Sequence, residues 1–120
     1  MQNLIPRKEE EQRLKALAEY RILGTKPESC YDDITKIAAS TCDVPISLMT
    51  LVDRDRQWFK SKVGLEINET KRDWSFCTHA IQENSPLIIH DAFQDERFIN
   101  NPLVTGDPKI RFYAGFPLKN

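Results

Sequence analysis

The sequence predicts a mixed α/β domain, of the α+β kind, and three observations indicate this class. Apolar residues recur at helical spacing in two segments near the N-terminus, residues 7–21 and 27–42. Two strand-like segments then flank the turn Asp53-Arg54-Asp55, which is typical of a hairpin. A short helix and two short apolar strands follow in the second half of the chain. Helices and strands are therefore mixed along a single chain.

The length and net charge of the chain limit the number of domains and the kinds of partner that we expect. The 120 residues are enough for one domain with one core. The net charge is −1, from 17 basic and 18 acidic residues, so no field of one sign attracts nucleic acid or an anionic membrane. Three cysteines cannot all pair, and the sequence shows no signal peptide or long apolar span. We therefore expect a reduced, cytoplasmic protein without nucleic-acid or membrane partners.

Two helices are predicted before Pro45. Glutamates at the start and leucines at helical spacing indicate the first helix, which we expect Gly24 to end. Pro27 suits the first position of the second helix, which runs toward Pro45. Four residues recur so as to line one face of that helix: Tyr31, Ile34, Ala38 and Cys42.

The hairpin strands differ in their patterns. Residues 46–52 are apolar on both alternations, which predicts a strand covered on both faces. Residues 56–63 alternate so that one face is expected to be largely solvated. Residues 65–74 are highly charged without periodicity, and we expect a mobile loop there at the edge of a pocket.

A short helix is predicted next, with Ser75 as its N-cap and with Cys77, Ala80 and Ile81 on its inner face. A buried strand is expected at residues 87–90.

Residues 92–110 contain two strong helix and strand breakers, Asn101-Pro102 and Gly106-Asp107-Pro108. We expect a long connection with one helical turn near residues 95–98, of the kind that often forms a lid or binding loop. A last strand is predicted at residues 110–118.

Five segments follow one another in a specific order. They are YRILGT at 20–25, PISLMTLVD at 45–53, RDRQWFKS at 54–61, FCTHA at 76–80, and the stretch from NPLV at 101–104 to Gly115. Together these segments resemble the GAF domain family of signalling proteins. The resemblance implies a PAS/GAF-type architecture, with an antiparallel sheet flanked by helices. It also implies a sensory or dimerising input module of a histidine kinase, diguanylate cyclase or phosphodiesterase.

Members of the family continue beyond Pro117-Leu118 with a further central strand and a closing helix. We therefore expect residues 1–120 to form a single GAF-like domain that is incomplete at its C-terminus. Residues 1–24 are expected to form an N-terminal helix that lies at a dimer interface.

The sequence shows no catalytic set. Cys77 resembles one cysteine of the GAF-type free methionine-R-sulfoxide reductases, but that chemistry needs a second thiol to resolve the oxidised intermediate. No cysteine follows position 77, and Cys30 and Cys42 fall on the predicted second helix. A buried structural thiol is the favoured interpretation.

Metal and cofactor sites are not expected either. Cys77 and His79 are two residues apart on a helix and point to different faces, so they cannot chelate one ion. Bilin-binding GAF domains usually carry a cysteine followed directly by histidine, whereas Thr78 intervenes here. Cyclic-nucleotide-binding members carry an Asn-Lys pair, and this chain has only the Asp95-Glu96 pair.

Aromatic residues on the predicted strands could line a ligand site or complete the core. Alternation means that neighbours such as Phe112 and Tyr113 cannot both face inward. Arg111 is a candidate anion partner at the mouth of a pocket, or a solvated arginine. The candidate ligand-binding residues are Trp58, Phe59, Cys77, Ile81, Arg111, Phe112 and Tyr113.

The predicted function is a non-catalytic sensory or regulatory module in a cytoplasmic signal-transduction protein. Its expected partners are a small-molecule ligand, a second copy of the chain in a homodimer, and a downstream output domain in a longer protein. Two alternatives remain open: an enzyme of the sulfoxide reductase type, and a purely structural dimerisation module.

Overall fold

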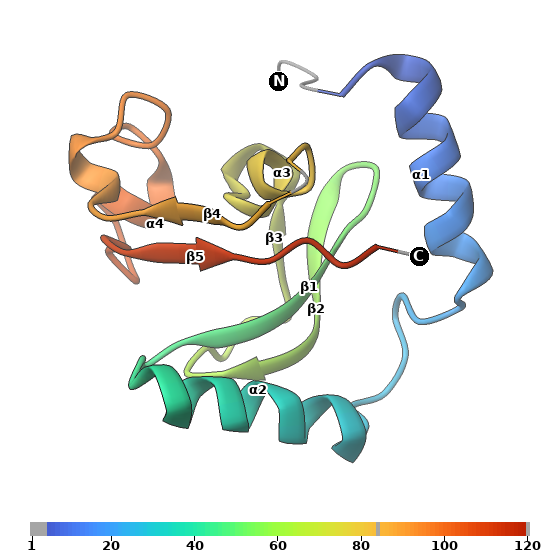
Figure 1. Cartoon of the computed structure of the whole chain (residues 1–120), viewed down its shortest axis with the longest axis horizontal. Helices are drawn as coiled ribbons and strands as arrows, with labels where there is room; N and C mark the ends of the chain where they lie inside the picture. Colours follow the sequence, from blue (N-terminus) through green and yellow to red (C-terminus); the bar gives the residue numbers. More distant parts are fainter. Residues whose placement is uncertain (1–4, 84, 120) are drawn as a thin grey trace. The chain divides into compact units, whose positions relative to one another are not determined.

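The computed structural model describes residues 5–83 and 85–119, which form two compact units (Figure 1). The first unit comprises residues 6–72, and the second comprises residues 73–119 together with Ile5. The predicted N-terminal segment 1–24 and the expected boundary at Asn120 both include residues outside those described.

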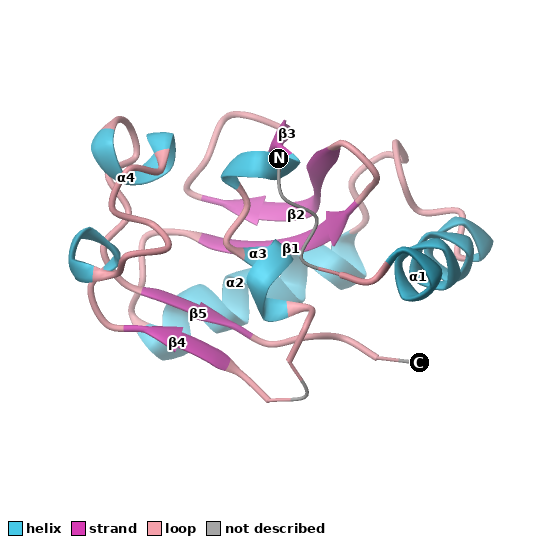
Figure 2. Cartoon of the chain, turned by 90° about the horizontal axis from the view of Figure 1, so that it is seen from above, coloured by secondary structure: helices cyan, strands magenta, loops and turns pink. Residues whose placement is uncertain are grey.

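The first unit carries two helices and a three-stranded antiparallel sheet in the order β1-β2-β3 (Figure 2). Its elements are α1 (Arg7–Glu19), α2 (Ser29–Cys42), β1 (Ser47–Val52), β2 (Arg56–Val63) and β3 (Glu69–Lys71). The predicted hairpin is confirmed, because β1 pairs with β2 from Ser47 opposite Val63 to Val52 opposite Gln57. The α2 helix packs along β1 and β2 (Figure 1).

Each helix is followed, within two residues, by a residue with a positive φ. Arg21 has φ 53°, and α1 stops at Glu19, so the helix ends before Gly24. Asp43 has φ 51°, and its N–H and that of Val44 bond the last carbonyls of α2.

The prediction of which residues form the inner face of α2 is wrong. Ile34, Ala38 and Cys42 are exposed, whereas Thr35 is buried. The reason is that α2 docks on β2 through polar contacts: the Thr35 hydroxyl lies 2.8 Å from that of Ser61, which also donates to the Asp32 carboxylate. The spacing of apolar residues in the sequence does not indicate such polar contacts.

The expectation of a solvated face on β2 is also wrong, because all five residues from Gln57 to Ser61 are buried. A β-bulge contributes to this. Thr50 lies opposite Phe59 and Met49 lies opposite Ser61, so Lys60 is an extra residue that interrupts the alternation. The β1 strand, expected to be covered on both faces, is mostly half-buried, because it is an edge strand of its sheet.

Residues 65–74 are not simply a loop, contrary to the prediction. They include β3, which pairs with β2, and the 3₁₀ helix η1 (Arg72–Trp74). Pairing with the preceding strand, β2, supplied the order that local periodicity did not show.

The second unit is built around two paired strands. Its elements are α3 (Cys77–Ala80), β4 (Leu87–Ile89), the 3₁₀ helix η2 (Ala92–Gln94), α4 (Pro102–Thr105) and β5 (Tyr113–Gly115). β4 and β5 pair antiparallel, with Ile89 opposite Tyr113. The predicted last strand over 110–118 is thus shorter than expected. The helical turns η2 and α4 interrupt the predicted long connection.

One apolar cluster forms the core of this unit. Its buried members are Phe76, Ile89, Ala92, Phe98 and Val104, and the Phe76 and Phe98 rings stack with centroids 4.2 Å apart. The Ser75 hydroxyl accepts the N–H of Thr78 at 3.2 Å, the kind of bond predicted for it, but α3 begins at Cys77 and Phe76 stands at its N-cap position. Asn101 caps α4 and donates to the Trp74 carbonyl at 3.1 Å.

The mixed α/β class with antiparallel strands is confirmed. Among residues 5–83 and 85–119, no helix has the length and hydrophobicity that a membrane crossing requires.

Candidate functional site

The candidate residues fall in both units, two in the first and five in the second. Trp58 and Phe59 are neighbours on β2, where side chains alternate between the faces of the sheet. Their exposed fractions are only 8% and 5%. Both rings are therefore part of the packed interior of the chain.

In the second unit, the structure brings Cys77 and Tyr113 together. The Tyr113 hydroxyl donates a hydrogen bond to the Cys77 sulfur, with Oη and Sγ 3.2 Å apart. Both residues are half-buried. The Tyr113 ring also packs against that of Phe76, with centroids 5.1 Å apart. A residue on α3 and a residue on β5 thus share one contact beside the apolar core.

The chemistry of this pair is that of a hydrogen-bond donor and a sulfur acceptor. Burial raises the pKa of the Tyr113 phenol, and the negative charge and hydrogen bond of a Cys77 thiolate raise it further. The phenol therefore keeps its proton at neutral pH. A protonated phenol can position a sulfur atom or stabilise its anion, but it cannot act as the base that activates a thiol.

Sequence reasoning missed Gly115, which makes this contact possible. A Cβ atom on Gly115 would lie 2.1 Å from the Tyr113 hydroxyl oxygen, so any larger residue would displace the phenol. Residues two apart on a strand share a face. The spacing of Tyr113 and Gly115 in the sequence Tyr-Ala-Gly could therefore have indicated that a small residue at position 115 makes room for the tyrosine.

The other three candidates have different surroundings. The Ile81 side chain is half-buried just after α3. Nη1 of Arg111 donates to the Val104 and Ile110 carbonyls at 2.9 and 3.0 Å, and its guanidinium carbon lies 4.8 Å from the centroid of the Phe93 ring. Arg111 therefore holds the loop after α4.

Phe112 is 53% exposed and lies just before β5, whereas Tyr113, the first residue of that strand, is half-buried. The prediction that these two neighbours cannot both face inward is thus confirmed.

His79 lies edge-on to Phe98, with ring centroids 4.9 Å apart. Burial lowers the pKa of His79, the Arg97 charge lowers it further, and Asp95 opposes the shift. Beside it on α3, the Thr78 hydroxyl oxygen is buried without a hydrogen-bond partner. Within the described part of the chain, no three His, Cys, Asp or Glu residues come together as a metal site would require.

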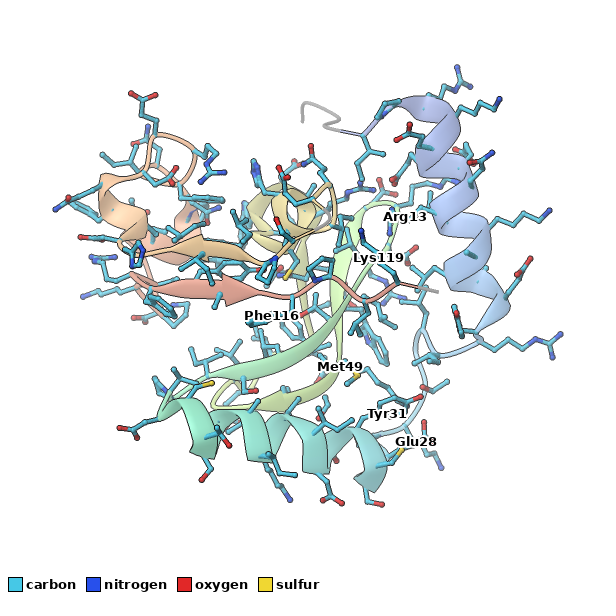
Figure 3. The ribbon with its side chains drawn as sticks, viewed as in Figure 1. Arg13, Glu28, Tyr31, Met49, Phe116 and Lys119 are labelled. Carbon is cyan, nitrogen blue, oxygen red and sulfur yellow. The ribbon has the colours of Figure 1, made fainter. Side chains whose placement is uncertain are left out.

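A buried lysine in the first unit was also missed. The Lys60 ammonium donates to the Glu28 carboxylate at 2.6 Å, and to the Thr25 hydroxyl and the Lys26 carbonyl at 2.7 Å each. It also lies 5.3 Å from the centroid of the Tyr31 ring. Figure 3 shows Glu28 and Tyr31 together at the start of α2. The lysine thus anchors the loop between α1 and α2.

Two comparisons place the chain among known proteins. The GAF domain family matches residues 26–120. The chain is also 41% identical over 97 residues to the cyclic di-GMP phosphodiesterase PA2567 of Pseudomonas aeruginosa. That alignment covers 81% of this chain but only 16% of the relative, so the chain spans a small part of the relative's length. The chain belongs to the GAF domain family.

Proposed function

We propose that the chain is a non-catalytic sensory and regulatory module of a longer bacterial signal-transduction protein. The observation that carries this proposal is the family match over residues 26–120, together with a relative, named as a cyclic di-GMP phosphodiesterase, of which the aligned segment is only 16%. The attached output domain would be a phosphodiesterase, a diguanylate cyclase or a histidine kinase. The three cysteines form no disulfide, which favours a reducing compartment such as the cytoplasm.

The proposed ligand is a small molecule that contacts Cys77 and Tyr113. Both side chains are half-buried, and together they offer a polarisable sulfur, an aromatic ring and a hydroxyl group. Such a ligand can act only by binding one conformation of the domain more tightly than another.

Native mass spectrometry of freshly purified protein tests this proposal, because it reports retained ligand and oligomeric state together. We expect a retained mass that is lost in Tyr113→Phe, which removes the hydroxyl, and kept in Phe112→Leu, a matched change at the exposed neighbouring residue. A ligand site at Tyr113 would be contradicted if the purified protein carried no bound ligand, so that neither variant changed the additional mass found with the protein.

A homodimer is the second part of the proposal. The half-buried Leu14 and Leu17 on α1 offer a narrow apolar stripe to a second copy. We expect a dimer in size-exclusion chromatography with light scattering, and Leu17→Glu should shift it toward the monomer. A dimer without retained ligand would instead favour a purely structural dimerisation module.

The enzyme alternative can be tested directly. Cys30 and Cys42 are both on α2, where twelve residues correspond to about 18 Å, too far apart to pair with each other. We expect no sustained reduction of free methionine sulfoxide in a thioredoxin-coupled assay. Turnover above that of Cys77→Ser would show that the module is a reductase.

A further inference from the structure

Three charged side chains of the first unit, two of them buried and Arg13 half-buried, form a cluster that joins α1 to the sheet. Glu10 and Arg13 belong to α1, and Arg72 follows β3. Nε and Nη2 of Arg13 each donate to a different oxygen of the Glu10 carboxylate, both at 2.9 Å. Arg72 donates to the same carboxylate through Nη1. The exposed fractions of the Glu10 and Arg72 side chains are only 7% and 5%.

The same guanidinium groups continue to the end of β1 and the turn after it. Nη1 of Arg13 donates to the Val52 carbonyl at 2.6 Å, and Nη1 of Arg72 lies 3.2 Å from the carbonyls of both Asp53 and Arg54. In Figure 3, Arg13 extends from α1 toward this turn. One carboxylate on α1 therefore holds two arginines that in turn bind the backbone of the hairpin.

Removing a partner from such a buried pair leaves an uncompensated charge, so the cluster resists partial opening. It is nevertheless incompletely satisfied, because two cations share one anion. In addition, Nε and Nη2 of Arg72 are buried without a hydrogen-bond partner in the described structure. Opening the cluster would therefore cost the loss of its ion pairs, but it would let water reach the two unsatisfied nitrogens of Arg72.

The position of the cluster in the chain gives it a role. The α1 helix precedes the residues that match the GAF domain family, 26–120, whereas Arg72 lies within them. Arg72 is also the last residue of the first unit and the first residue of η1, and its backbone N–H donates to the Asp55 carbonyl at 3.3 Å. The cluster thus connects a helix outside the matched region to the hairpin turn and to the chain that leads into the second unit.

We propose that Glu10, Arg13 and Arg72 form a latch through which α1 controls the hairpin turn and η1. With the latch closed, α1 holds the turn and the start of η1 in place. With the latch open, all three segments are released together. This inference does not depend on the proposed small-molecule ligand.

Hydrogen exchange of the whole chain, followed by mass spectrometry, tests the latch in Glu10→Gln. We expect exchange on the order of 100-fold faster in α1, in the turn 53–55 and in η1, because the two guanidinium groups lose their only charged partner in the cluster. Exchange in β4 and β5 should stay unchanged. The matched control is Glu11→Gln, which breaks the exposed Glu11–Arg54 pair between the same helix and the same turn. It should change exchange by no more than about fivefold.

A second variant keeps the test decisive if Glu10→Gln fails to fold. Arg13→Gln leaves the bond between Glu10 and Arg72 in place, and we expect the same three segments to exchange about tenfold faster. Equal acceleration in α1 and in β4 and β5 would show a general loss of stability and overturn the proposal. Acceleration confined to α1, without the turn and η1, would overturn it as well.

Discussion

Two substitutions at the Lys60–Glu28 pair should have unequal effects on stability. The side chain of Lys60 is 1% exposed, whereas that of Glu28 is 55% exposed. In Lys60→Met, the carboxylate that remains can be hydrated, and the methionine fills most of the volume of the lysine stem. In Glu28→Gln, the buried ammonium remains and loses its charged partner.

The magnitudes follow from this difference in burial. Breaking a buried ion pair by removing one partner costs about 3–5 kcal/mol, and replacing the buried charge by an apolar side chain is often neutral. The Thr25 hydroxyl and the Lys26 carbonyl still accept from Lys60 in Glu28→Gln, so we expect a loss of about 2 kcal/mol. For Lys60→Met, we expect a change within about 1 kcal/mol.

Urea unfolding followed by circular dichroism measures both changes. With a typical slope of about 2 kcal/mol per M, the midpoint for Glu28→Gln should fall by about 1 M, while that for Lys60→Met should barely move. Glu28 also precedes the N-terminus of α2, where a negative charge is favourable by about 0.3–1 kcal/mol. Repeating Glu28→Gln in the Lys60→Met background isolates this contribution, and Lys36→Met on the exposed face of α2 controls for the substitution itself.

The reasoning would be refuted if Lys60→Met destabilised the protein as much as Glu28→Gln. It would also fail if Glu28→Gln cost the same with and without Lys60.

Two further predictions concern other parts of the chain. Gly115→Ala should displace the Tyr113 phenol and lower the melting temperature, and a nuclear magnetic resonance spectrum should show shifted signals around Cys77. Burial would raise the pKa of Glu10, but hydrogen bonds and charge from its two arginines outweigh burial and lower it from 4.5 to about 2. A carboxyl group whose pKa is lower in the folded than in the unfolded protein stabilises the fold at pH values above the unfolded-state pKa. About 3 kcal/mol of the free energy of unfolding should therefore be lost as the pH falls from 4.5 toward 2. In urea titrations across that range, Glu10→Gln should not show this loss.

Much of the secondary structure could be predicted from the sequence, because its signals are local. The charge and spacing of residues 7–21 predicted α1, and the turn at Asp53-Arg54-Asp55 predicted the hairpin. Ser75 lies two residues before the short helix to which it is hydrogen-bonded, and strand alternation predicted that Phe112 and Tyr113 would not both face inward.

Only the tertiary structure decided which polar groups are buried and what they contact. The bulge opposite Met49 and Thr50 interrupts the alternation of β2 at Lys60, and β3 orders a segment without periodicity of its own. The Glu10–Arg72 contact joins residues 62 positions apart. A periodic pattern records whether a side chain prefers water or the interior. It does not record which distant donor satisfies a buried carboxylate or ammonium, because that depends on how the strands and helices meet.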